Sequence, residues 1–524
     1  MKQVKEAHMK RTIASIAILA LVAGFGFAAP TEESMADTGP VKLTVGYRAH
    51  PDDTLDFELP WYVEWQERTN TEIEFIVFPA DTYEEKRNLV LASGDIPDIV
   101  SVESAIANTY GPDGLFQALD DLALEVVQSD MLRDYYSDAA KNYHHRAPDG
   151  HLYMIPRFNE LAGSPENGIA YRVDVMKELG LTEPDDIEGW YEVLKAVKEG
   201  RPDLIPLSTN AAWFEGGYLR MFGPSYDIGI GLYQTYWGFL ISEMDAGQVT
   251  FLPGTDNYRQ LMSFMHRLHA EGLLDQEYIT NNYNDWWNGK VAAGKEFMQL
   301  TNTWRANAAN ITAENAGVSV DYDTAEFPVN PATGERALTR VANPWSDFAM
   351  AISAESEHQR EAMALLDYFY TDEGAEFYVY GIEGVSYGRD DDGNPTVDGW
   401  DNRLIGTKRY EIGYPSMFVS PIFLSRFLQG PRAVLMKDHF ERTIPIMIGY
   451  PSLQTSGPEF EEMTNLFADL QTYVQESSNK FITGDLSVDS DWDGYVAQLE
   501  RLGADRGTEI VQGWYENYQA FVGN

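Results

Sequence analysis

One stretch of this sequence places carboxylates at the spacing of a cation site. Residues 489–500, DSDWDGYVAQLE, match the calcium-loop pattern D-x-D-x-D-G-x5-E, in which acidic side chains surround the ion. However, Trp492, Tyr495 and Leu499 recur at helical spacing inside it, and Ser490 with Asp493 has the spacing of a helix cap. We therefore interpret this stretch as the start of a helix and predict no cofactor, with calcium as the alternative.

A second pair of carboxylates lies in SGDIPDIV, residues 93–100, where Asp95 and Asp98 flank Pro97. A catalytic pair, half of a metal site and a turn are the three possible interpretations. Gly94 is typical of the residue that follows a helix, and Pro97 cannot continue one. We predict a turn, after which the Asp98 carboxylate binds backbone N–H groups at the start of a buried strand.

Complete motifs of metalloprotease catalysis and of nucleotide binding are missing from the sequence. There is no H-E-x-x-H, G-x-x-x-x-G-K-[ST] or G-x-G-x-x-G, and G-x-S-x-G occurs only as GVSYG at residues 384–388. The adjacent histidines His144 and His145 are expected to be exposed rather than to bind a metal. We predict no catalytic residue and no metal ligand, and hence a protein that is not an enzyme.

The overall charge is strongly acidic. In 524 residues there are 38 Lys and Arg against 82 Asp and Glu, which gives a net charge of −44. Such a field repels nucleic acid and anionic lipids, so neither is an expected partner. Cysteine is absent, which excludes disulfides, thiolate ligands and cysteine nucleophiles.

The first residues have the three-part pattern of a secretory signal. A basic stretch precedes an apolar run over residues 13–28, and Gly26 and Ala28 suit a cleavage site. We predict a signal peptide over residues 1–28, with cleavage after Ala36 or a retained anchor as alternatives. Because no cysteine is present to carry a lipid, the protein is expected in the periplasm or another extracytoplasmic space, without a lipid anchor.

The elements that would position a site alternate between strand and helix. Apolar residues alternate over 41–47 and 71–79, and 98–102 is a short β-branched run. A helix is expected to end near Ala92, with a capping box at Asp81 and Glu84. This order predicts an α/β fold with a largely parallel sheet.

Five segments in order resemble one family. They are LASGDIPDIV, YRVDVMKELGLTEPDDIEGWYEVLKAVKE, AISAESEHQREAMALLDYFYTDEGAEFYVYGIEG, YVQESSNKFITGDL and WDGYVAQLERLGADRGTEIVQGWYENY. Together they resemble the family 1 extracellular solute-binding proteins of ABC importers, in the large branch that binds sugars and oligosaccharides.

The resemblance implies a two-lobed periplasmic-binding-protein fold, a type II clamp with the ligand cleft between two α/β lobes. Lobe 1 would comprise residues 38–157 plus about 346–425, and lobe 2 residues 158–345 plus about 426–524. The implied partners are a carbohydrate ligand and ABC transporter permease subunits, and the protein would be a monomer. Two departures are the missing anchor cysteine and the short GRPDLIPLS region, where some relatives carry a calcium loop.

Sugar recognition needs flat apolar rings and planar polar groups. For each aromatic residue the alternative is a place in the core, and for each polar residue a place on the surface. Position in the family pattern and at strand ends favours ten ligand-binding residues. They are Trp304, Trp213, Asn210, Arg157, Asn159, Tyr47, Arg48, Glu103, Ser104 and Trp345.

The leading functional prediction is the binding component of an ABC transporter that closes around a carbohydrate and delivers it to the permease. The alternative is a secreted carbohydrate-active enzyme that uses an Asp/Glu pair. A sensory role for the same fold stays open, and so does the identity of the sugar.

Overall fold

The computed structural model describes residues 39–48, 57–79, 82–158, 167–210, 218–219, 221–228, 239–242, 248–302, 304–334, 340–341, 344–396, 448–449, 453–454 and 458–522. Contacts divide the chain into two units, Met1–Pro40 and Val41–Asn524, and every described helix and strand lies in the second. The predicted signal peptide over residues 1–28 falls outside the described residues.

A five-stranded sheet, here called the first sheet, has the order β2-β1-β3-β12-β4. Strands β1 and β2 are parallel along their whole length, β1 and β3 are also parallel, and β12 runs antiparallel to both β3 and β4. The strands are β1 (Val41–Arg48), β2 (Thr71–Phe78), β3 (Ile99–Glu103), β4 (Ile155–Phe158) and β12 (Trp345–Ile352). The three strands predicted from the alternation and the β-branched run are thus confirmed.

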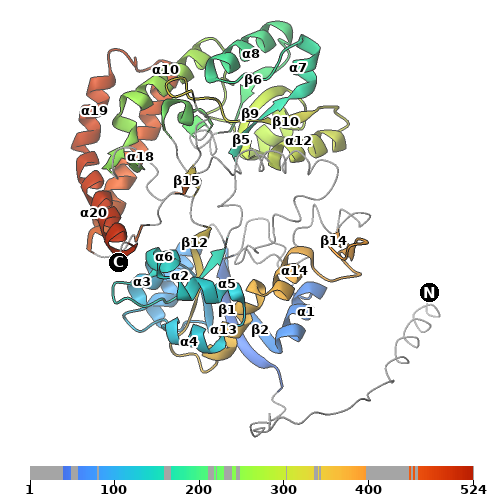
Figure 1. The fold of residues 1–524 in the computed structure, drawn as a ribbon, viewed down its shortest axis with the longest axis vertical. Coiled ribbons are helices and arrows are strands. Elements are labelled where there is room, and N and C mark those ends of the chain that lie inside the picture. Colours follow the sequence, from blue (N-terminus) through green and yellow to red (C-terminus); the bar gives the residue numbers. More distant parts are fainter. Residues whose placement is uncertain are drawn as a thin grey trace, which may run out of the picture. The chain divides into compact units, whose positions relative to one another are not determined.

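Helices cover both faces of the first sheet because its strands are apolar on both sides. Along β12, Met350 and Ile352 contribute to one buried cluster, whereas Ala349 and Ala351 contribute to another. This is the layering expected of an α/β fold. Figure 1 shows the helices around this sheet. They are α1 (Pro60–Thr69), α2 (Tyr83–Ser93), α3 (Ser104–Tyr110), α4 (Asp120–Val126), α5 (Asp130–Ser137), α6 (Ala139–Asn142), α13 (Gln359–Asp367) and α14 (Asp372–Tyr380).

A four-stranded sheet, here called the second sheet, has the order β10-β5-β9-β6. Strand β9 is parallel to β6 and antiparallel to β5, which is in turn antiparallel to β10. The strands are β5 (Asn167–Arg172), β6 (Ile205–Ser208), β9 (Glu296–Asn302) and β10 (Tyr322–Ala325).

The largest buried cluster joins the second sheet to helices that are distant in sequence. It includes Ile169 of β5, Trp190 of α8, Met262 of α10 and Trp492 of α19. A smaller buried cluster contains Ala170 of β5 and Trp286. The helices are α7 (Val173–Leu179), α8 (Ile187–Gly200), α10 (Asp256–Ala270), α11 (Tyr283–Trp286), α12 (Trp304–Asn315), α18 (Pro458–Thr483), α19 (Trp492–Arg501) and α20 (Ala504–Val522). No described helix is long and apolar enough to cross a membrane.

Short elements complete the described chain. Strands β13 and β14 form a hairpin, in which the Asp390 carboxylate accepts hydrogen bonds from the backbone N–H groups of Asp392 and Asn394. The short elements are β7 (Phe239–Ser242), β8 (Gln248–Phe251), β11 (Arg340–Val341), β13 (Gly388–Arg389), β14 (Pro395–Thr396), β15 (Ile448–Gly449), η1 (Tyr143–His145), η3 (Gly223–Tyr226), η4 (Leu252–Gly254), η5 (Trp287–Val291) and η6 (Tyr368–Tyr370).

Helix α2 ends as predicted but begins differently. Gly94 has the left-handed φ of 74° after a helix that runs to Ser93. The N-cap is Thr82, without a capping side-chain hydrogen bond, and Asp81 of the predicted capping box lies outside the described residues. The start of this helix is therefore predicted less well than its end.

The prediction that His144 and His145 are exposed is wrong. The residues are 7% and 0% exposed, and the Nδ1 atom of His145 lies 2.7 Å from the hydroxyl of Tyr135. Burial, together with the neighbouring His144, lowers the pKa of His145 well below its ordinary value. A neutral imidazole with a hydroxyl partner can occupy a core, which a pattern of residue types alone does not reveal.

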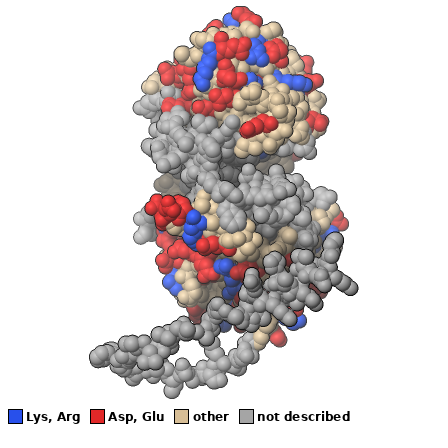
Figure 2. Space-filling model, turned by 90° about the vertical axis from the view of Figure 1, so that its right-hand side faces the viewer, with Lys and Arg blue, Asp and Glu red and all other residues tan. Residues whose placement is uncertain are grey.

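Charged side chains lie among uncharged ones on the described surface. Figure 2 shows Asp and Glu spread over the described part of this face, with Lys and Arg lying among them. This distribution agrees with the sequence, which has 82 acidic and 38 basic residues, and the described part of this face shows no broad basic patch.

Candidate functional site

Several strands of the first sheet end at one edge. Strands β1, β3 and β4 end at Arg48, Glu103 and Phe158, and the antiparallel β12 begins beside them at Trp345. Ligands of open α/β sheets bind outside the carboxyl ends of the strands. This edge is therefore the candidate ligand-binding region of the first sheet.

Six side chains at this edge form what we call the strand-end cluster: Arg48, Tyr83, Arg87, Glu103, Arg157 and Phe348. The guanidinium carbon of Arg48 lies 5.2 Å from the ring centre of Tyr83 and 5.3 Å from that of Phe348. Arg157 lies over the same Phe348 ring at 5.7 Å. Guanidinium groups at this distance are attracted to the face of an aromatic ring, so the rings help to orient the donors.

The inner side of the strand-end cluster is fixed by polar contacts. Arg87 lies 5.2 Å from the Tyr83 ring centre and forms an ion pair with the Glu103 carboxylate. The Tyr83 hydroxyl donates a hydrogen bond of 2.9 Å to the carbonyl of Ser101. Burial, followed by the nearby Glu103, raises the pKa of Tyr83, so the hydroxyl stays protonated and keeps donating.

Three of the predicted ligand-binding residues are thus brought together. Arg48, Glu103 and Arg157 come from three different strands and meet at one edge, and Ser104 follows as the buried first residue of α3. Whether they bind a ligand stays a prediction. Phe348 was missed by the sequence analysis, although its place directly after the predicted Trp345 region could have drawn attention to it.

Two predicted residues of this region, Tyr47 and Trp345, are buried. Tyr47 is 1% exposed and makes edge contacts with Phe57 and Phe75. In β1 alternate side chains face opposite sides, so Tyr47 points inward with Val45. The packing favours a structural role over contact with a ligand.

Trp345 is also enclosed by other rings. It is 6% exposed, and its ring centre lies 4.5 Å from Tyr135 and 5.0 Å from Phe158. Trp345 lies at the start of a strand, but Tyr135 of helix α5 covers its ring and shields it from solvent. Trp345 therefore has the surroundings of a core residue.

The second sheet has a corresponding edge. The parallel strands β6 and β9 end at Ser208 and Asn302, and the predicted Asn210 and Trp304 each follow two residues later. Asn210 is fully buried, and Trp304 begins α12. The backbone thus places both predicted positions at the same edge, whereas the side chain of Trp304 and the residues Trp213 and Asn159 lie outside the described parts.

A buried polar network lies beneath this second edge. The Asp275 carboxylate accepts hydrogen bonds from Ser208, from Asn281 at 2.9 Å and from Lys290 at 2.7 Å. Burial by itself would lower the pKa of Lys290, but its bonds to Asp275 and Glu277 outweigh this and raise it. The network holds the loop before α11 against the end of β6.

Glu296 is the most perturbed carboxyl of this region. It is fully buried at the start of β9, and its Oε2 accepts a hydrogen bond of 3.2 Å from the Trp286 indole N–H. Burial, aided by the charge of Asp275, raises the pKa of Glu296 to about 8 and outweighs its hydrogen bonds. Glu296 is thus a neutral acid near neutral pH.

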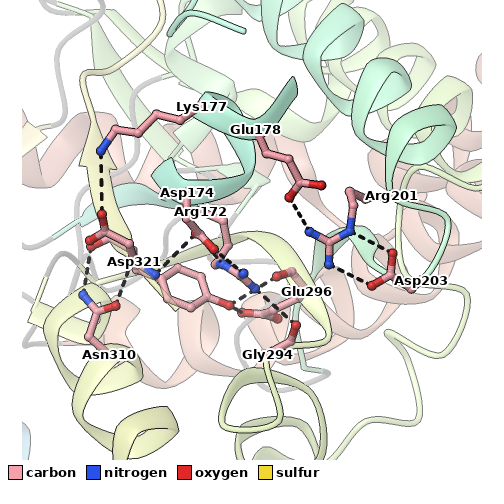
Figure 3. A network of polar contacts seen from close by, with 11 residues as sticks. Arg172, Asp174, Lys177, Glu178, Arg201, Asp203, Gly294, Glu296, Asn310 and Asp321 are labelled. Atoms are coloured by element: carbon pink, nitrogen blue, oxygen red, sulfur yellow. Dashed lines mark hydrogen bonds and ion pairs between the residues drawn. The ribbon is translucent and has the colours of Figure 1, made fainter. Parts of the chain in front are cut away.

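A network of ion pairs stabilises the opposite edge of the second sheet (Figure 3). Arg172 at the end of β5 binds both oxygens of Asp174 and donates to the carbonyl of Gly294 at 3.2 Å. Burial would raise the pKa of Asp174, but the bonds from Arg172 lower it. Nearby, Arg201 lies between Glu178 and Asp203. Because these residues lie away from the carboxyl ends of β6 and β9, we assign them a structural role and not a role in ligand binding.

The calcium-like stretch 489–500 begins a helix, as interpreted from its sequence. Helix α19 starts at Trp492, and the Asp491 carboxylate accepts the backbone N–H of Ser487 at 2.8 Å. The cap is Asp491 rather than the predicted Ser490. Within the described part of the chain, no three or more His, Cys, Asp or Glu side chains are grouped to hold a metal ion.

Comparison with known proteins identifies a family and several relatives. Residues 52–376, more than half of the chain, match the bacterial extracellular solute-binding proteins. The fructooligosaccharide ABC transporter substrate-binding protein FusA of Streptococcus pneumoniae serotype 4 is 24% identical over 87% of this chain and 86% of its own length. The polygalacturonan/rhamnogalacturonan-binding protein YtcQ of Bacillus subtilis is 22% identical, with 87% of both chains covered.

Solved structures have the same fold. The alginate-binding protein AlgQ2, solved without calcium ion, gives a TM-score of 0.72 at 20% identity and covers 92% of this chain and 99% of that chain. FusA in complex with kestose gives a TM-score of 0.70 at 20% identity and covers 91% of this chain and 99% of that chain. These neighbours are two-lobed solute-binding proteins, which confirms the predicted fold class. The predicted lobe boundaries stay a prediction.

Proposed function

Because the chain belongs to the family of bacterial extracellular solute-binding proteins, we propose that it is the carbohydrate-binding component of an ABC transporter. Its ligand is an oligosaccharide, which it delivers to the permease in an extracytoplasmic space. Ligand contacts from both lobes are completed only on closure, so binding shifts the population toward the closed state.

The strand-end cluster is the observation that carries this proposal. Sugars are bound by aromatic faces together with planar donors and acceptors, and the cluster offers rings, guanidinium groups and a carboxylate at one sheet edge. The relatives support the ligand class, since FusA is named for fructooligosaccharides, YtcQ for polygalacturonan and rhamnogalacturonan, and AlgQ2 for alginate.

We set aside the alternative of a secreted carbohydrate-active enzyme. A glycosidase needs two carboxyl groups on either side of the scissile bond. The one carboxylate of the strand-end cluster, Glu103, is held in an ion pair with Arg87. The matched relatives are named as binding proteins, which also supports a binder without turnover.

The proposal is tested by thermal shift of the purified protein against mono- and oligosaccharides, with and without calcium. Binding to the folded state alone raises Tm by mass action, by an amount equivalent to about 2.7 kcal/mol at one hundred times Kd. We expect a shift with at least one oligosaccharide, no calcium requirement, and no released product by chromatography. Turnover of the ligand, or no shift across the panel, contradicts the proposal.

A substitution at the edge of the first sheet tests the location of the site. We expect Arg157→Ala to weaken the binding of that sugar by at least about tenfold, since a hydrogen bond from a charged donor contributes roughly 1.5–3 kcal/mol. Arg201→Ala is the matched control, because Arg201 lies in the ion-pair network of the second sheet. Titration calorimetry measures both. Equal affinities of the two variants would place the site elsewhere.

A further inference from the structure

Phe348 is a large apolar side chain that the fold leaves open to solvent. It is 41% exposed, whereas Ala349, Met350, Ala351 and Ile352, which follow it in β12, are buried. In the strand register it pairs with Glu103, the last residue of β3. The ring thus lies at the strand-end edge, beyond the part of β12 that the helices cover.

Two guanidinium groups flank this ring. Arg48 from β1 and Arg157 from β4 have their guanidinium carbons 5.3 Å and 5.7 Å from its centre. Isolated exposed apolar residues are common and need no function. Here, however, the ring of Phe348 in β12 contacts Arg48 of β1 and Arg157 of β4. Three strands of the sheet therefore fix its position.

Such an arrangement suits one face of a sugar ring, because Phe348 is still 41% exposed with both guanidinium groups over its ring. The C–H face of a pyranose or furanose is apolar and packs against an aromatic ring, while its edge carries oxygens. A guanidinium group has five N–H donors and no acceptor, so the groups around Phe348 match hydroxyl, ring or carboxylate oxygens of a ligand. An aliphatic side chain at this position would offer no flat surface.

We propose that Phe348 is the residue on which a ring of the carbohydrate ligand stacks, with Arg48 and Arg157 donating to the oxygens at its edge. The inference rests on the proposed function and names the residue that positions the ligand on the first sheet.

Three substitutions separate stacking from general apolar contact. Phe348→Trp keeps a flat ring, Phe348→Leu keeps apolar volume without one, and Phe348→Ala removes both. Stacked aromatic contacts contribute about 0.5–1.5 kcal/mol beyond their buried area, so we expect Phe348→Leu to lose about twofold to tenfold in affinity and Phe348→Ala more. Phe348→Trp should bind within about twofold of the original protein and more tightly than Phe348→Leu.

Leu89→Ala is the matched control, because Leu89 is an exposed apolar residue, 63% accessible, on helix α2 beside the same sheet. Its affinity should equal that of the original protein. Titration calorimetry with the sugar found in the thermal-shift panel gives the affinities, and the melting temperature of each variant without sugar checks that it is folded.

The outcomes distinguish this inference from the proposed function. If the original protein binds no sugar, the proposed function fails. If it binds sugar and Phe348→Ala binds equally well, the function stands and the stacking role is overturned. Equal affinity of Phe348→Leu and the original protein also overturns it, since apolar volume alone would then suffice. Loss of affinity in Phe348→Leu and Phe348→Ala, with retention in Phe348→Trp, supports it.

Discussion

At the scale of the residue, Glu296 links burial to pH dependence. Its pKa is raised to about 8 in the folded protein, above its ordinary 4.5, so between these values the folded state holds a proton that the unfolded state has lost. Stability falls with rising pH wherever the folded state binds more protons. The contribution of Glu296 is therefore complete below its ordinary pKa and is lost as the pH rises through about 8.

We expect Glu296→Gln to remove this dependence, because an amide is neutral at every pH and still accepts the hydrogen bond from Trp286. Between its unfolded and folded pKa values, one such group changes the free energy of unfolding by about 1.4 kcal/mol per pH unit. Urea unfolding from about pH 5 to about pH 8 should therefore show a smaller decline in the variant. Glu85→Gln, an exposed change on α2, is the control, and parallel slopes for all three proteins would refute the assignment.

At the scale of the element, Asp98 joins two strands and the approach to a helix. Its carboxylate accepts the backbone N–H of Thr44 in β1 at 2.8 Å and the hydroxyl of Ser356, before α13, at 2.5 Å. Burial would raise the pKa of Asp98, but the bonds from Ser356 and Thr44 outweigh it and lower the value. Its predicted role of binding a backbone N–H group is thus confirmed.

We expect Asp98→Asn to lower the free energy of unfolding by about 1–3 kcal/mol, since it leaves partly buried donors with poorer partners. The exposed Asp95 lies in the same turn, and Asp95→Asn should stay within about 0.5 kcal/mol of the original protein. Because the folded pKa of Asp98 is lowered, its stabilisation is present above the ordinary value of 3.8 and is lost as the pH falls through the folded pKa. Urea unfolding of both variants measures the difference, and equal losses would contradict it.

At the scale of the whole molecule, the net charge of −44 opposes the compact state. Added salt shortens the Debye length from about 30 Å at 0.01 M to about 10 Å at 0.1 M and so screens this repulsion. We expect Tm to rise over that range, measured by calorimetry without sugar. Surface ion pairs such as Arg201 with Asp203 are weakened by the same screening, so a falling Tm would mean that they outweigh the repulsion.

Much of the architecture could be predicted from local pattern. The strands at 41–47 and 98–102 and the helix end at Gly94 depend on residues within a few positions of one another. The five sequence segments that resemble the solute-binding proteins, taken in their order along the chain, also predicted the family. Helix starts were predicted less well, because Thr82 and Asp491 serve as caps through backbone geometry rather than residue type.

The sequence alone determined the alternation of elements, the acidic charge and the family resemblance, since each is carried by residue types at short spacing. Only the tertiary structure decided that Tyr47 and Trp345 are enclosed, that the histidine pair is buried, and that Phe348 lies between two arginines. These facts depend on the order β2-β1-β3-β12-β4, which brings residues 48, 103, 157 and 348 to one edge. Contacts across such distances in the chain arise from strand pairing and helix packing, and no short pattern encodes them.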